Sequence, residues 1–161
     1  KYRSHTEVML TRGAEHKYLG MMMILKDGKF RVDITKKVKD ILEEFPLKFN
    51  DNDRKIMTPV GQDMFEKGDD KYLEKEGREL FHRVVAQNLF ISKQGRQDIQ
   101  PIIAVLCTRV QTPTEKDWSR LIRYMQWLHK TKDNTITFDA GKGLNTFEWY
   151  IDASFAVHPD F

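Results

Sequence analysis

The sequence lacks the features that mark several large classes of protein. Its one cysteine, Cys107, cannot form an internal disulfide, and its 5 histidines do not have the spacing of a zinc finger. No apolar run approaches the roughly 20 residues of a membrane-spanning helix, and residues 1–5 contain no apolar core of a signal peptide. We therefore expect an intracellular protein in a reducing compartment, with no membrane partner.

The sequence also lacks the short motifs of many self-contained enzymes. It contains no phosphate-binding glycine-rich loop, no G-x-S-x-G and no H-E-x-x-H. What it does contain is typical of a folded protein, with 40% hydrophobic and 32% charged residues in a chain of 161. The net charge of +3 is too small to identify a nucleic-acid partner, so the positions of the charges must decide that question.

The first part of the chain predicts a β-hairpin followed by a helix. Two β-compatible runs, residues 18–25 and 29–34, are separated by Asp27-Gly28, a pair that favours a tight turn. Thr35 is placed to cap a helix that ends before Pro46. The apolar residues of that helix repeat at helical spacing and are Val38, Ile41, Leu42 and Phe45.

The rest of the chain predicts a linker, a helical block and further strands. Asp98 is placed to cap one helix, and Thr112-Pro113-Thr114-Glu115 has the pattern of a cap at Thr112 for the last helix. The order of elements predicts an α+β protein. Its expected sections are residues 1–46 with the hairpin, 47–77 as a linker, 78–133 as the helical block, and 134–161 with strands at 135–138 and 146–151.

The last long helix carries basic residues that could bind phosphate groups. Lys116, Arg120, Arg123 and Lys130 lie near one side of it at helical spacing. Lysine and arginine on a rigid support bind nucleic-acid phosphates without reading the sequence of bases. A solvated helix face explains the same spacing, so both interpretations stay open at this point.

Two other segments are candidates for a functional role. Asp152 follows an apolar, aromatic run, and a carboxylate there could bind Mg²⁺ or serve only to end a strand. Tyr18-Leu19-Gly20-Met21 places a glycine within a β-compatible run, where it marks either a turn or bulge, or a close approach of a ligand.

Short strings along nearly the whole chain, each weak by itself, form a specific pattern together. They are His16-Lys17-Tyr18-Leu19-Gly20-Met21, Ile41-Leu42-Glu43-Glu44-Phe45-Pro46, Thr58-Pro59, Phe81-His82-Arg83-Val84-Val85-Ala86, Arg96-Gln97-Asp98-Ile99, Leu106-Cys107-Thr108-Arg109-Val110, Pro113 with Asp117-Trp118, Arg123-Tyr124, and Tyr150-Ile151-Asp152-Ala153-Ser154-Phe155-Ala156. In order and spacing the sequence resembles the reverse transcriptase and ribonuclease H region of copia-type retrotransposon polyproteins. Gln97 departs from the family, which usually has proline there.

The resemblance implies a role for each section of the chain. Residues 1–46 would be the end of the polymerase palm, with Tyr18, Leu19, Gly20 and Met21 in a hairpin that holds the primer end. The helical block would be the thumb and connection, which favours phosphate contact by the basic face of the last helix. Residues 134–161 would begin a ribonuclease H-like mixed sheet, with Asp152 as a catalytic Mg²⁺ ligand.

The resemblance also implies that the chain acts as part of a larger enzyme. Its partners would be an RNA/DNA template-primer duplex and the remainder of the polyprotein, in a cytoplasmic virus-like particle or in the nucleus. The paired aspartates of the polymerase and most ribonuclease H ligands are not in this sequence, so we expect no activity from the chain alone. The alternative is a stand-alone helical module that binds nucleic acid or protein through Arg120 and Arg123, without catalysis.

Overall fold

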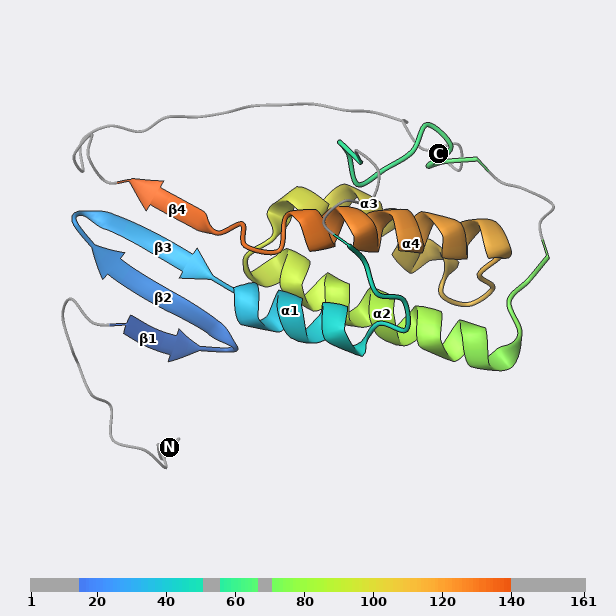
Figure 1. Cartoon of the computed structure of the whole chain (residues 1–161), viewed down its shortest axis with the longest axis horizontal. Helices are drawn as coiled ribbons and strands as arrows, with labels where there is room; N and C mark the ends of the chain where they lie inside the picture. The colour runs from blue at the N-terminus through green and yellow to red at the C-terminus, as the bar shows by residue number, and fades with distance from the viewer. Residues whose placement is uncertain (1–14, 51–55, 67–70, 140–161) are drawn as a thin grey trace, which may run out of the picture.

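The computed structural model describes residues 15–50, 56–66 and 71–139. The fold is α+β, as the sequence predicts, with a four-stranded antiparallel sheet at one end of a body of helices (Figure 1). The strands are β1 (Glu15–Tyr18), β2 (Met21–Lys26), β3 (Lys29–Asp33) and β4 (Ile136–Asp139). The helices are α1 (Thr35–Glu44), α2 (Lys75–Gln94), the short η1 (Gln97–Ile99), α3 (Gln100–Arg109) and α4 (Glu115–Lys130).

The predicted hairpin forms, and a second hairpin precedes it. Asp27 and Gly28 join β2 to β3 with φ angles of 52° and 71°, the left-handed conformation that tight hairpin turns require. The run at residues 18–25 is not one strand, because it is divided at Leu19 and Gly20, whose φ angles are 47° and 82°. Gly20 is therefore a turn glycine, which confirms the turn interpretation of that segment.

The fourth strand follows the last helix and is far from the other three strands in the sequence. Residues 135–138 were predicted as a strand, and β4 pairs antiparallel with β3, with Phe30 opposite Phe138. The strand order is therefore β1-β2-β3-β4, with β1 and β4 at the two edges. The predicted strand at 146–151 lies outside the described residues.

Helix α1 forms with the buried face that the sequence predicts, but Thr35 does not cap it. The N-cap position is Ile34, and the side chain of the preceding Asp33 supplies an acceptor, since its Oδ1 accepts hydrogen bonds from the backbone N of Thr35 at 2.9 Å and from Thr35 Oγ1 at 2.7 Å. A carboxylate placed just before the first helical turn satisfies donors that the helix leaves unpaired. Val38, Ile41, Leu42 and Phe45 are all buried, as expected.

The predicted cap at Asp98 is also wrong, because this carboxylate is used by Arg96. Nε and Nη2 of Arg96 each bond to Asp98 at 2.9 Å, so the two side chains form a two-pronged ion pair. The Arg96 Nη1 donates to the carbonyl oxygen of Thr131 at 2.9 Å, and the guanidinium lies 5.3 Å from the ring centre of Trp127. Arg96 is 1% exposed and joins the end of α2 to the end of α4.

The last helix begins two residues later than predicted. Thr114, not Thr112, is the N-cap, and it forms a capping box with Asp117. The backbone N of Asp117 donates to Thr114 Oγ1 at 3.3 Å, and the backbone N of Thr114 donates to Asp117 Oδ2 at 3.0 Å. Pro113 consequently lies before the helix, where its carbonyl oxygen accepts a hydrogen bond from Leu73 N.

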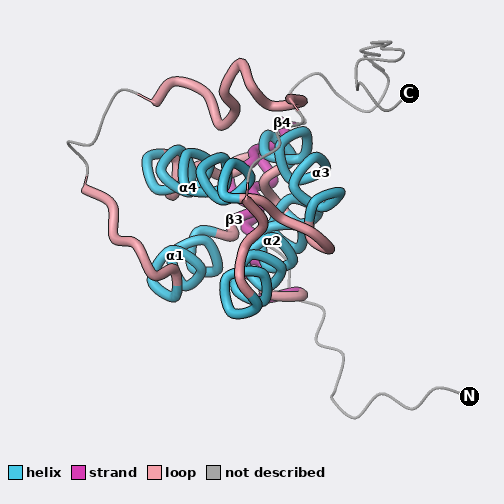
Figure 2. Tube along the Cα trace, turned by 90° about the vertical axis from the view of Figure 1, so that its right-hand side faces the viewer, coloured by secondary structure: helices cyan, strands magenta, loops and turns pink. Residues whose placement is uncertain are grey.

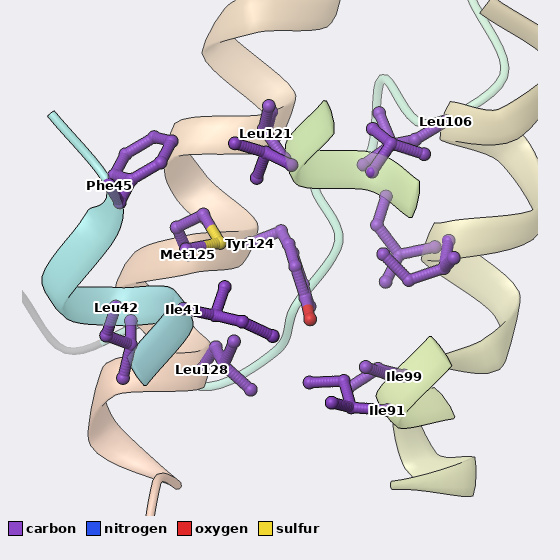
Figure 3. Packing of buried hydrophobic residues seen from close by; sticks show 14 of the residues in the cluster. Ile41, Leu42, Phe45, Ile91, Ile99, Leu106, Leu121, Tyr124, Met125 and Leu128 are labelled. Carbon is purple, nitrogen blue, oxygen red and sulfur yellow. The ribbon is translucent and has the colours of Figure 1, made fainter. Parts of the chain in front are cut away.

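The four helices surround one hydrophobic core. Figure 2 looks along the long axis of the molecule and shows α1, α2, α3 and α4 around the same interior. Side chains from all four helices meet there (Figure 3), and those fully buried include Ile41, Phe81, Ile91, Leu106, Leu121 and Met125. In the part of the chain that the structure describes, no helix is long and apolar enough to cross a membrane.

Candidate nucleic-acid interface

Arg120 does not lie on an exposed basic face, so that part of the sequence prediction is wrong. Its side chain is 6% exposed, and Nη1 bonds to Asp117 Oδ1 at 2.9 Å. Nη2 donates to the carbonyl oxygens of Asp63 and Glu66, the latter at 2.8 Å. Arg120 is therefore a structural residue that fastens residues 63–66 to α4.

The other basic residues of α4 are only partly available to a ligand. Lys116 is ion-paired with Glu66 at 2.8 Å, and Arg123 is half-buried beside Gly61. Lys130 is exposed. Residues 60–66, which were predicted as part of a linker, lie along this side of α4 instead. The stand-alone module that would bind through Arg120 and Arg123 has no structural observation in its favour.

The residues predicted to hold a primer end form the tip of the hairpin between β1 and β2. Tyr18 and Leu19 are 57% and 59% exposed, which is high for side chains of their size and apolarity. Gly20 occupies the turn, and Met21 packs against the edge of the core. The tip therefore presents an aromatic and an aliphatic side chain from a backbone that is anchored on one side.

A groove adjoins this hairpin and crosses the sheet. Two depressions, of about 550 Å³ and 480 Å³, share Glu15, Ile24 and Arg31 in their walls and are therefore neighbours. The first contains the whole predicted tip, from Tyr18 to Met21. The basic residues that line the two depressions are Lys17, Lys26, Lys29, Arg31 and Lys36.

The register of the strands explains how these residues meet. Lys17 lies opposite Met22, and Arg31 lies opposite both Ile24 and Thr137, so these side chains share one face of the sheet. The opposite face carries Val32, which is buried beside Gly95 at the end of α2. The helices cover only the Val32 end of that face, because Leu25, Phe30 and Phe138 on the same face are exposed. The face with the groove carries the basic side chains, with Met22 and Ile24 partly buried between them.

The groove has a positive balance of charge. Its walls hold the five basic residues and three acidic ones, Glu15, Asp27 and Asp33. Asp33 also accepts a hydrogen bond from Thr35 N at the start of α1. All five basic side chains are exposed, so each can keep its ammonium or guanidinium group hydrated until a phosphate replaces water.

The sequence predicts a role for Tyr18–Met21 but not for the basic residues around them. A signal for some of them was present, since Lys29 and Arg31 are two positions apart within a predicted strand and so share one face. Lys17 and Lys36 have no such local signal. They join the groove only because β1 pairs with β2 and because α1 begins directly after β3.

The predicted Mg²⁺ ligand, Asp152, lies outside the described residues. Within residues 15–50, 56–66 and 71–139, no three histidine, cysteine, aspartate or glutamate side chains come together to hold a metal ion. The Mg²⁺ site therefore stays a prediction from the resemblance.

The chain was also compared with known proteins. No family model, no curated protein and no solved structure matches it.

Proposed function

We propose that this chain is the end of the palm, the thumb and the connection of a copia-type reverse transcriptase, and that it positions the RNA/DNA template-primer duplex. The observation that carries the proposal is the groove on the face of the sheet that carries the basic side chains. It brings the predicted primer-holding residues Tyr18–Met21 together with Lys17, Arg31 and Lys36 in one depression. The proposed basic contacts are therefore on the sheet and at the start of α1, and not on α4, where Lys116, Arg120, Arg123 and Lys130 were expected to bind.

The chemistry of the groove suits the backbone of a nucleic acid. Exposed lysine and arginine side chains bind phosphates with an affinity that falls as salt rises, because bound counterions are released. At the tip, Tyr18 offers a flat aromatic ring and Leu19 an aliphatic surface for contact with a sugar or a terminal base. No part of this arrangement requires a particular base, which fits an enzyme that copies any template.

The parent enzyme would synthesise DNA on an RNA template and degrade the RNA strand. In that enzyme Asp152 would bind Mg²⁺ at the start of the ribonuclease H domain, where the ion activates water and neutralises charge. The residues that the structure describes would bind and orient the RNA/DNA duplex and would not take part in catalysis. The rest of the polyprotein would supply the other ligands, within a cytoplasmic virus-like particle or in the nucleus.

The groove is tested by reversing two of its charges. We expect the double variant K17E/R31E to bind a fluorescent RNA/DNA hybrid at least ten-fold more weakly, whatever its sequence. Its dependence of binding on salt should be shallower, by about one unit of logarithmic slope for each lost contact. The matched control is K75E/R83E, which reverses two exposed charges on α2. Equal loss in both variants, or in neither, overturns the assignment of the groove.

The identity of the parent is tested by the DNA that flanks this reading frame. An aromatic-x-Asp-Asp strand encoded upstream, and further acidic residues at ribonuclease H spacing downstream, would support the copia-type enzyme. A short closed reading frame would contradict it, and the groove would then have to be explained without a polymerase.

A further inference from the structure

A polar cavity of about 190 Å³ lies between the end of α3 and the start of α4. Arg109, the last residue of α3, lines it together with Tyr72 and Thr112. The Nε and Nη2 atoms of Arg109 are buried, and neither has a hydrogen-bond partner within the part of the chain that the structure describes. These two nitrogens form one edge of the guanidinium, the edge that binds two oxygens of one anion in parallel.

The carboxylates of the same cavity are engaged by other cations. Glu66 Oε2 is bound by Lys116 Nζ at 2.8 Å. Asp117 uses Oδ1 for Arg120 Nη1 at 2.9 Å and Oδ2 for the backbone N of Thr114 at 3.0 Å. Arg109 is therefore the basic residue of this cluster whose charge no described carboxylate offsets at ion-pair distance.

An unpartnered guanidinium edge is costly, and an anion would remove the cost. A buried donor without an acceptor loses its hydration and gains nothing in return. The cavity is more than ten-fold larger than the space that one water molecule requires, roughly 10–15 Å³ on the same measure. Tyr72 and Thr112 are exposed and carry hydroxyl groups, so they can donate hydrogen bonds at the rim.

We infer that this cavity binds a phosphate group, held in two-pronged fashion by Arg109 and at the rim by the hydroxyls of Tyr72 and Thr112. The phosphate is either a free ion or a phosphodiester of a nucleic-acid backbone, which have the same charged oxygens. The inference does not rest on the proposed function, because the cavity shares no residue with the groove on the sheet. Figure 1 shows the loop between α3 and α4 at the opposite end of the helical body from the sheet.

The test is a titration of the ¹⁵N-labelled chain with sodium phosphate, at an ionic strength held constant with sodium chloride. We expect saturable shifts of the Thr112 amide signal and of the Arg109 Nε–H signal. Arg109→Met should abolish the Thr112 shift. Arg83→Met, which removes an exposed arginine of α2, should leave it unchanged.

Two outcomes overturn the inference. One is the absence of a saturable shift in the wild-type chain, a result that needs no variant to fold. The other is a Thr112 shift that survives in a folded Arg109→Met chain. Thr112→Val serves as a milder second variant, since it removes one rim hydroxyl and should weaken phosphate binding several-fold without touching the guanidinium.

An RNA/DNA hybrid added to the phosphate-saturated chain distinguishes the two sources of phosphate. Reversal of the phosphate-induced Thr112 shift by the hybrid supports a backbone phosphodiester, and retention of that shift supports free phosphate. The K17E/R31E variant should bind phosphate as the wild type does. The cavity and the groove can therefore fail independently of each other.

Discussion

Tyr124 donates a hydrogen bond of 2.7 Å from its hydroxyl group to Oδ1 of Asn88, and both residues are completely buried. Asn88 also uses its amide nitrogen, since Nδ2 donates a hydrogen bond to the carbonyl oxygen of Val84 at 2.8 Å. A polar link of this kind ties α4 to α2 inside an otherwise apolar interior. It favours one relative placement of the two helices, because any shift would leave buried polar atoms unpaired.

Tyr124→Phe should destabilise the protein by about 1–2 kcal/mol at pH 7, since Asn88 Oδ1 loses its donor. Burial raises the pKa of Tyr124 well above its ordinary value of 10.0, with Arg96 opposing the shift and Asp98 adding to it. The unfolded chain therefore loses this proton first, so the stability that the neutral tyrosine contributes is intact below pH 10 and falls above it. The free energies of unfolding of the wild type and of Tyr124→Phe should become equal near pH 11, where the wild type has lost about 1.4 kcal/mol of stability. Urea denaturation at both pH values checks this.

The control for that experiment is Tyr18→Phe, because Tyr18 is 57% exposed. This variant should match the wild type within about 0.5 kcal/mol at pH 7. A constant difference between Tyr124→Phe and the wild type from pH 7 to pH 11 would contradict the pKa assignment.

Arg120→Met should cost about 3 kcal/mol of stability, because it leaves the buried carboxylate of Asp117 without its cation. It should also release residues 63–66, whose carbonyl groups Arg120 holds. Faster amide hydrogen exchange at Phe65 and Glu66 would report that release. The comparison is Lys130→Met on the exposed side of α4, which should change stability by less than about 0.5 kcal/mol. Equal stability of Arg120→Met and Lys130→Met would contradict the role of Arg120 in fastening residues 63–66 to α4.

Thr114→Ala and Thr112→Ala should differ in stability. Thr114 caps α4, so its loss should cost about 1 kcal/mol, whereas Thr112 precedes the helix and should cost less than about 0.5 kcal/mol. Thermal denaturation of the two variants side by side is sufficient. A lower melting temperature for Thr112→Ala than for Thr114→Ala would contradict Thr114 as the cap and support the cap at Thr112 that the sequence predicts.

The proposed function predicts that Asp152→Asn in the full-length parent abolishes RNA cleavage and leaves DNA synthesis largely intact, because Asp152 would be a metal ligand of ribonuclease H alone. Gel assays of both activities on one RNA/DNA substrate give the two readouts. Asp139→Asn is the control, since that carboxylate is exposed at the end of β4 and only 3.7 Å from the equally exposed Lys29. RNA cleavage that survives in Asp152→Asn removes this residue from the metal site.

Local patterns predicted most of the elements but not their partners. The hairpin at Asp27 and Gly28 and the buried face of α1 depend on neighbouring residues, and both are confirmed. The burial of Arg120 depends on its hydrogen bonds to Asp63 and Glu66, which lie in a segment without any hydrophobic periodicity. Helical spacing places a side chain on a face, yet it cannot show which distant segment covers that face.

The cap at Thr112 and the strand at residues 18–25 failed for a related reason. In both places a neighbouring arrangement of the chain makes more backbone hydrogen bonds than the predicted one. Thr114 and Asp117 satisfy each other reciprocally. The turn at Leu19 and Gly20 allows all four residues of β1 to pair with β2.

The position of β4 has one more consequence. The chain leaves the sheet at Asp33 and returns beside it, since Val32 and Ile136 are paired neighbours. The helical body is therefore an insert between two adjacent strands, and a short turn could in principle take its place and close a plain hairpin. The four helices could thus be replaced as one unit without changing the pairing of the strands, although Lys36 of α1 would then be lost from the groove.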